Sequence, residues 1–173
     1  ELISGMAEVV KHGIISDPEL FSICSRGMGW MRENLEEVVR RAMAVKINVI
    51  EEDPYEKGIR AALNLGHTVG HAVELVSKFE LRHGEAIAIG MVAEAGYAER
   101  IGLAEPGLTG TIRETLSNLG LPTQIPGAMP REEIIRAMRV DKKKNAKSIR
   151  FALPVSISKV DLVDVHDLES VLE

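Results

Sequence analysis

Residues 63–72 read Leu-Asn-Leu-Gly-His-Thr-Val-Gly-His-Ala, and the fold expected for the chain follows from this stretch. The spacing of its apolar residues predicts one helix over about residues 58–78. Steps of three and four return to the same side of a helix, so one face would carry a stack of polar groups. These are Arg60, Asn64, His67 and His71. Gly66 and Gly70 would each cost this helix about 1 kcal/mol relative to alanine, which a helix accepts where another helix or a ligand lies close to its backbone.

The two histidines of this stretch indicate a site without matching a known protease motif. Thr68 follows His67, whereas the thermolysin-type zinc motif needs Glu at that place. The alternative is that both are hydrogen-bonded histidines of the core or surface with no further role. His83 follows a short turn at residues 78–81 and begins a helix expected over about 83–101. An antiparallel pair of these helices would bring His67 and His83 together, although His83 alone could simply neighbour a helix cap.

A carboxylate near the start of the chain adds to this set. The stretch Ser-Gly-Met-Ala-Glu-Val-Val-Lys over residues 4–11 lies in a helix expected to run from about 5 to 15, with Ser4 as its cap. Glu8 and Lys11 are three residues apart, so a surface ion pair is the plain alternative. Apolar neighbours leave this helix little polar face, and a partly buried carboxylate needs a cation or a metal.

One glutamate and two histidines make a plausible set of three ligands for zinc. A catalytic zinc keeps its fourth position open for water or substrate, whereas a structural zinc is closed by four ligands and favours cysteine. Cys24 is the one cysteine in the sequence, which excludes both a thiolate-rich site and an internal disulfide. A reducing compartment fits that cysteine usage, and we expect a cytoplasmic protein.

Cations are scattered along the same chain. Lys46 stands between Val45 and Ile47, and Arg60 belongs to the polar stack. Three lysines follow Asp141, over residues 142–144. The alternatives are a lysine whose stem lies along the surface and a solvated lysine loop. If these cations converge on a metal, they indicate a small ligand with several negative charges, as carboxylate or phosphate.

Composition bounds the class of protein. The chain has 173 residues, of which 45% are hydrophobic and 27% charged, and its net charge is −5. These values are ordinary for a soluble globular protein, and the acidic balance excludes a general attraction to nucleic acid or to an anionic membrane. The longest apolar runs, such as residues 86–93, are far shorter than the roughly 20 residues that span a bilayer. The chain opens on Glu1 with a helix expected at once, so we expect no signal peptide and a chain cut from something longer.

The expected fold is mainly α-helical, in one domain over residues 1–173. Besides the three helices named above, the pattern predicts four more, over about residues 18–25, 35–52, 109–119 and 131–140. Asp17 and Pro18 are expected to cap and start the first of these, and Asn34 precedes the second. Near the end of the chain the apolar residues no longer follow helical spacing but alternate with polar ones or form short runs. Residues 149–153, 155–157 and 160–165 therefore predict a short β-hairpin with its turn at Ser158-Lys159.

Four of these stretches together resemble the 3-dehydroquinate synthases. They are residues 4–11, residues 63–72, the run His-Gly-Glu-Ala-Ile-Ala-Ile-Gly-Met over 83–91, and Asp-Lys-Lys over 141–143. The resemblance covers essentially the whole chain, but only the C-terminal, helical half of such an enzyme. It implies a parent protein that binds NAD mainly on an N-terminal α/β domain, which is absent here, with the active site between the two domains. It also implies a homodimeric parent.

The resemblance carries roles onto individual residues. Glu8, His67 and His83 match the zinc ligands, with cobalt as an alternative metal. Further positions match residues that hold the substrate or serve its proton transfers, and they are Lys11, Lys46, Arg60, Asn64 and His71. Lys142 matches a residue that makes a further contact to the substrate. The extra Lys144 leaves open which lysine of this run aligns with that residue.

The implied reaction converts 3-deoxy-arabino-heptulosonate 7-phosphate into 3-dehydroquinate and phosphate, with NAD oxidising a ring hydroxyl transiently. It belongs to the shikimate pathway of aromatic amino acid biosynthesis. Without the NAD domain, the chain alone is expected to be inactive. Two alternatives stay open: another sugar-phosphate cyclase, such as a 2-deoxy-scyllo-inosose or valiolone-type synthase, and a non-catalytic helical module for dimerisation.

Overall fold

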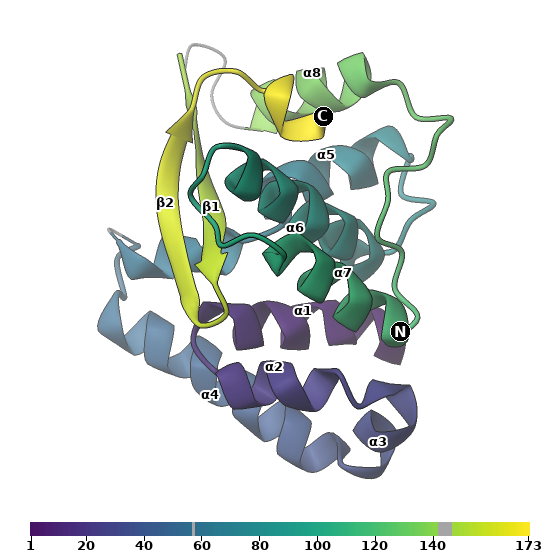
Figure 1. Ribbon diagram of the computed structural model, residues 1–173, viewed down its shortest axis with the longest axis vertical. Coiled ribbons are helices and arrows are strands. Elements are labelled where there is room, and N and C mark those ends of the chain that lie inside the picture. The colour runs from purple at the N-terminus through teal and green to yellow at the C-terminus, as the bar shows by residue number, and fades with distance from the viewer. Residues whose placement is uncertain (57, 142–146) are drawn as a thin grey trace.

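The fold is arranged around one buried helix, α6 (His83–Arg100). Its apolar residues surround the helix on nearly every side, which is typical of a helix enclosed by neighbours. The elements that pack against it include α1 (Leu2–Ile15), α5 (His67–Val76), α7 (Leu108–Asn118) and β1 (Ile149–Ser156). Figure 1 shows α6 at the centre, with α1 below it, α5 above it and α7 in front. The computed structural model describes residues 1–56, 58–141 and 147–173.

Two groups of shorter elements complete the molecule. A layer below α1 is formed by three consecutive helices: α2 (Pro18–Cys24), α3 (Gly27–Glu33) and α4 (Leu35–Glu52). Helix α8 (Arg131–Asp141) lies at the opposite end of the molecule (Figure 1). A short 3-10 helix, η2 (Ser170–Leu172), closes the chain. The mainly α-helical fold is as predicted, and none of the helices in the described ranges is long and apolar enough to cross a membrane.

The expected caps are confirmed in one case and wrong in another. Asp17 accepts a hydrogen bond from the Leu20 N–H at 2.9 Å and starts α2 at Pro18. Ser4, however, lies inside α1, which begins at Leu2. Its hydroxyl oxygen accepts a hydrogen bond from the Gly84 N–H at 3.0 Å, so Ser4 serves the start of α6 instead of its own helix. Helix α3 was not predicted, because seven residues with two glycines show no periodic signal.

The prediction of one helix over residues 58–78 is wrong. A 3-10 helix, η1 (Ile59–Asn64), is followed by α5, and the chain turns between them at Gly66, whose φ is +78°. The buried carboxylate of Glu94 on α6 causes the break: it accepts hydrogen bonds from the N–H groups of Gly66 (2.6 Å) and Val69 (3.2 Å). These N–H groups at the start of α5 would otherwise lack acceptors. The face expected to carry Arg60, Asn64, His67 and His71 is therefore split between two elements.

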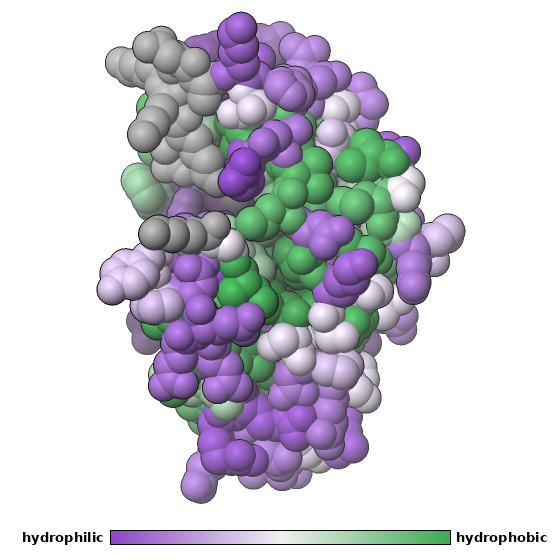
Figure 2. Space-filling view, turned by 90° about the vertical axis from the view of Figure 1, so that its left-hand side faces the viewer, coloured by the Kyte–Doolittle hydropathy of each residue, from purple (hydrophilic) through white to green (hydrophobic). Residues whose placement is uncertain are grey.

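The predicted hairpin is confirmed, with one continuous first strand in place of two pieces. Strand β1 pairs antiparallel with β2 (Lys159–Val165), from Ile149 opposite Val165 to Ser156 opposite Lys159. The register shifts between Pro154 and Ser156, and the turn residue Ser158 has a φ of +72°. Figure 2 looks at the side of the molecule on which β2 lies and shows a broad hydrophobic area between hydrophilic ends.

Candidate metal centre

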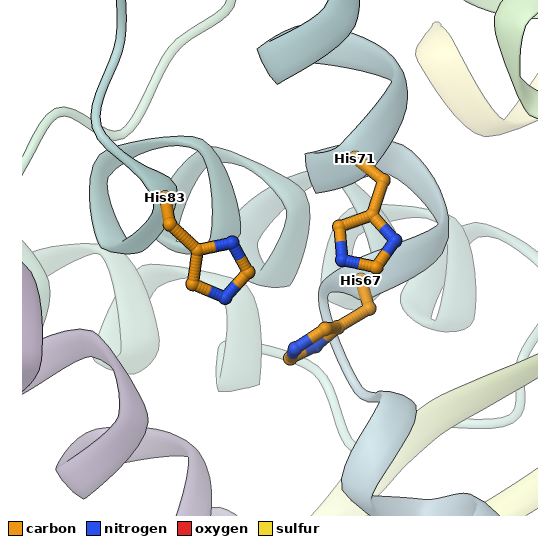
Figure 3. Close-up of side chains that lie close together, drawn as sticks. All are labelled: His67, His71 and His83. Atoms are coloured by element: carbon orange, nitrogen blue, oxygen red, sulfur yellow. The ribbon is translucent and has the colours of Figure 1, made fainter. Parts of the chain in front are cut away.

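Close packing of α5 on α6 brings the histidines together. A Cβ added at Gly90 of α6 would overlap the Gly66 carbonyl oxygen, and one added at Gly70 would lie 2.8 Å from Ile87 Cδ1. Contact with α6, which was one of the two predicted reasons, thus explains Gly70, whereas Gly66 lies before the helix at a turn with a φ of +78°. As a result, the ring centroids of His67 and His83 lie 5.5 Å apart (Figure 3).

His71 belongs to the same cluster of imidazoles. Its ring centroid lies 5.1 Å from that of His67 and 5.8 Å from that of His83. One nitrogen atom from each of the three rings lies within 4.8 Å of the others. Among the described residues these rings form the one group of three donors that lie this close to one another, so geometry by itself allows His71 as a ligand beside His67 and His83 (Figure 3).

Glu8 approaches the same imidazoles from α1. Its Oε1 atom lies 3.6 Å from His67 Nε2 and 4.0 Å from His83 Nε2, while its Oε2 atom lies 2.7 Å from Lys11 Nζ. The Oε1 atom is buried and has no hydrogen-bond partner among the described residues. A buried carboxylate oxygen without a partner is costly, and it faces two imidazole nitrogens. One carboxylate oxygen and two imidazole nitrogens are donors that zinc accepts, so these residues fit the metal implied by the resemblance.

The Nδ1 atoms of His67 and His83 have hydrogen-bond partners of their own. His67 Nδ1 lies 3.1 Å from the Leu65 carbonyl oxygen, and His83 Nδ1 lies 3.3 Å from Glu74 Oε2. Histidines that bind metals commonly donate their second N–H to a carbonyl or carboxylate in this way. Such bonds assign the proton to Nδ1 and leave the Nε2 lone pair facing Glu8. Glu74 was missed by the sequence analysis, because its role depends on the packing of α5 against the start of α6.

Burial and charge favour the metal-binding protonation states. Burial, and after it the nearby Lys11 ammonium, lower the pKa of His67 to about 4. Burial alone would raise the pKa of Glu8, but the Lys11 ammonium outweighs it and the carboxyl pKa is lowered. Burial also lowers the pKa of Lys11, against the opposing effect of Glu8. At neutral pH the site therefore presents a carboxylate and a neutral imidazole, as a divalent cation requires.

Beside these groups lies a cavity of about 370 Å³. The predicted substrate residues Lys11, Lys46, Arg60 and Asn64 line it, together with Glu8, His67 and His83. His71 is not among the lining residues and contacts the site through its ring neighbours. Lys142 lies outside the described residues. The lining also contains His12, Glu56 and Leu63, which the sequence analysis did not single out.

Comparison with known proteins shows which family the chain belongs to. The model of the 3-dehydroquinate synthase C-terminal family matches residues 5–144. The chain belongs to this family. A 3-dehydroquinate synthase of Caldanaerobacter subterraneus is 38% identical to it over 178 residues, which cover 100% of the chain and 49% of the relative. One of Nostoc punctiforme is 40% identical over 171 residues, covering 95% and 47%. The chain thus spans about half the length of the relatives it matches.

Solved structures of related cyclases share the fold of this family member. A 2-deoxy-scyllo-inosose synthase, in complex with carbaglucose-6-phosphate, NAD⁺ and Co²⁺, matches 98% of the chain with a TM-score of 0.83 and 25% identity. A 2-epi-5-epi-valiolone synthase from Streptomyces hygroscopicus, with NAD⁺ and Zn²⁺ bound, matches 98% with a TM-score of 0.80 and 25% identity. The chain covers 50% and 49% of these two proteins.

Proposed function

We propose that the chain is the metal- and substrate-binding half of a 3-dehydroquinate synthase, which converts 3-deoxy-arabino-heptulosonate 7-phosphate into 3-dehydroquinate and phosphate. The observation that carries this proposal is the convergence of Glu8, His67 and His83 beside a cavity lined by Lys11, Lys46 and Arg60. Zinc, or cobalt in its place, would be held by Glu8 Oε1 and the two Nε2 atoms and would supply a Lewis acid that polarises a substrate hydroxyl.

The chain's own residues divide the remaining work. Lys11, Lys46 and Arg60 would bind the carboxylate and phosphate oxygens of the substrate, and Asn64 would orient its hydroxyls. His71 would move a proton, because an imidazole can both accept and donate one and its ring contacts that of His67. Lys142 would add a further contact to the substrate. Enclosure between this half and the rest of the enzyme would exclude water and fix the orientation of the substrate.

The partners belong to the same proposal. NAD binding is assigned to the half of the relatives that this chain does not cover, where a separate N-terminal domain would hold it. The chain over residues 1–173 would be one helical domain of a homodimeric enzyme. Cys24 is a buried free cysteine, and a reducing cytoplasmic setting fits it.

The second candidate is another sugar-phosphate cyclase, because the solved structures that share the fold are of that kind. The relatives named 3-dehydroquinate synthase are 38% and 40% identical, against 25% for those structures, which favours the first proposal. The two differ in the substrate carboxylate. An enzyme that joins this chain to its N-terminal half should turn over the heptulosonate phosphate and not glucose 6-phosphate, and the reverse preference would favour the second candidate.

Zinc stoichiometry tests the metal centre directly. The purified chain should bind one zinc per molecule, and His67→Ala and His83→Ala should abolish binding while circular dichroism shows an unchanged fold. His166→Ala is the matched control, because His166 is exposed, its Nδ1 lies 3.2 Å from the Lys147 carbonyl oxygen, and it is not among the residues that line the cavity. Zinc binding that survives in both site variants would contradict the proposal.

A further inference from the structure

His12 is a buried histidine of the cavity that the proposed function leaves without a role. It follows Glu8 by four residues on α1, so both side chains lie on the same face of the helix. Only 5% of His12 is exposed, yet it lines the cavity with Lys11 and Lys46. It is therefore a buried part of the cavity wall, on the same helix as Glu8 and Lys11.

Neither ring nitrogen of His12 has a hydrogen-bond partner among the described residues, and both are buried. Buried polar groups in native proteins are nearly always paired, and leaving one unpaired costs about 1–3 kcal/mol. A functional cavity tolerates such a group where a ligand or an ordered water supplies the missing partner. The ring thus has hydrogen-bonding capacity that the described protein atoms do not use.

The charges around His12 indicate which kind of ligand would use this capacity. The groups that act on it electrostatically are Lys11 and Lys46, which are cationic, and Glu8, which is anionic and bonded to Lys11. Burial and the Lys11 ammonium hold the pKa of His12 at about 4, so the ring is neutral with one N–H donor and one acceptor nitrogen. Two lysines attract an anion, and a neutral N–H adds a directed bond that a flexible ammonium does not.

We propose that His12 is a further ligand-binding residue of this cavity, which donates its ring N–H to an anionic oxygen attracted by Lys11 and Lys46. The inference rests on the proposed function in one respect, since it takes the cavity as the binding site for a small anion. The shared chemistry is an anionic oxygen, as phosphate or as carboxylate. His12 would fix the position of that oxygen, whereas the lysines supply most of the attraction.

Calorimetric titration of the chain with inorganic phosphate, and in a second arm with malonate, tests this inference. His12→Phe removes the donor and keeps an aromatic ring, so the dissociation constant for one of the two anions should rise about fivefold to tenfold. The arm that responds identifies the group that His12 binds. Lys46→Ala should weaken binding through the charge, and His166→Phe, at an exposed position that does not line the cavity, should bind as the unaltered chain does.

His12→Asn and His12→Gln keep the test decisive if the phenylalanine variant does not fold. Asn places an amide near the position of Nδ1 and Gln near that of Nε2, so one of them should bind the anion nearly as the unaltered chain does and the other should bind it more weakly. The inference would be overturned if His12→Phe bound the anion as tightly as the unaltered chain does. It would also be overturned if all three variants bound the anion with the affinity of the unaltered chain. That outcome is the one expected if an ordered water is the partner of the ring.

The results also separate this inference from the proposed function. If Lys46→Ala weakens phosphate binding and His12→Phe does not, the role of His12 is wrong and the anion cavity stands. If the unaltered chain binds neither anion, the inference is overturned, while zinc stoichiometry still decides the metal centre. If His12→Phe weakens anion binding in a chain that holds no zinc, His12 binds the anion and the proposed function fails.

Discussion

At the scale of single residues, Glu8 decides between two possible metal sites. The cluster of His67, His71 and His83 satisfies the distances for a three-histidine site without any carboxylate. Glu8, however, places an unpartnered Oε1 atom 3.6 Å and 4.0 Å from the Nε2 atoms of His67 and His83. The Nδ1 atoms of these two rings have partners behind them, which turns both Nε2 atoms toward Glu8. We therefore expect Glu8, and not His71, to be the third ligand.

A pair of variants tests this choice. Glu8→Gln should lower zinc affinity by more than about 100-fold, because even the loss of a partner behind a ligand costs 10–100-fold. His71→Asn should leave one zinc per chain, since its assigned role is proton transfer. Competition with a chelating dye measures both affinities. Retention of zinc by Glu8→Gln together with its loss in His71→Asn would show that the three-histidine site is the real one.

Glu74 supports the site from behind His83. Its Oε2 atom lies 3.3 Å from His83 Nδ1, so Glu74→Gln should lower zinc affinity about tenfold by weakening the orientation and basicity of the ring. Glu80→Gln, at an exposed position beyond the end of α5, serves as the control. Equal zinc affinities in the two variants would remove Glu74 from the site.

The residues that sequence reasoning missed share one property. Glu74 and His12 matter through the elements packed against them, and nothing in their immediate sequence neighbours shows that packing. Glu8, His67 and His83 were found because two histidines at a spacing of four, and a glutamate among apolar residues, are unusual in themselves. The resemblance of four stretches to one family then indicated that these residues meet.

At the scale of elements, helix bounds followed the sequence where local signals were strong. Helix α4 runs over Leu35–Glu52 as predicted, because Asn34 and Asp53-Pro54 mark its ends and apolar residues recur between them. The helix predicted over residues 58–78 failed because its break depends on a distant residue. Glu94, which is fully buried on α6, accepts the N–H groups of Gly66 and Val69, and no local pattern shows that bond.

The contact between α5 and α6 predicts a large effect of one added methyl group. In Gly90→Ala the new Cβ would overlap the Gly66 carbonyl oxygen, so α6 would have to move away from α5. We expect a loss of at least about 3 kcal/mol of unfolding free energy, at the upper end of overpacking costs. Urea denaturation followed by circular dichroism measures it.

Gly110→Ala is the matched control for this change. Gly110 also lies within a helix, α7, but a Cβ there would meet nothing within 4 Å. This variant should gain up to about 1 kcal/mol through helix propensity. Similar stabilities of Gly90→Ala and Gly110→Ala would contradict the close packing described here.

The docking of α2 on α4 depends on Asp17 and predicts a pH dependence. Arg41 donates to both carboxylate oxygens of Asp17, at 3.0 Å and 2.7 Å, and the Leu20 N–H donates to one of them. Burial would raise the pKa of Asp17, but these bonds outweigh it and the folded pKa lies below the usual value. The stabilisation is therefore fully present above the unfolded pKa of about 3.9 and is lost as pH falls through the lower, folded pKa.

Asp17→Asn measures this contribution. The variant should be less stable than the unaltered chain by about 1–3 kcal/mol near neutral pH, since its amide can still cap α2 but loses the bidentate ion pair with Arg41. Below about pH 4 the two unfolding free energies should converge, because the carboxyl of the unaltered chain becomes protonated. Parallel unfolding curves with a constant difference down to the most acidic pH would contradict the assignment.

At the scale of the whole molecule, the site ties together parts of the chain that are far apart in sequence. Glu8 comes from α1, His67 from the start of α5 and His83 from the start of α6. The Gly84 N–H donates to the Ser4 hydroxyl oxygen, so the start of α6 is already held against α1 without a metal. A metal bound to all three ligands would link α1, α5 and α6, and it could do so only in the folded chain, where the three ligands come together.

Zinc should therefore stabilise the whole chain against heat. Zinc at about 100 times its dissociation constant adds about 2.7 kcal/mol to the unfolding free energy. For a chain of this size that corresponds to a rise in Tm of about 5–10 °C, which differential scanning calorimetry with and without a chelator measures. Glu8→Gln should show no such rise. An equal rise in Glu8→Gln would mean that zinc binds elsewhere, and no rise in the unaltered chain would mean that α1, α5 and α6 hold no metal between them.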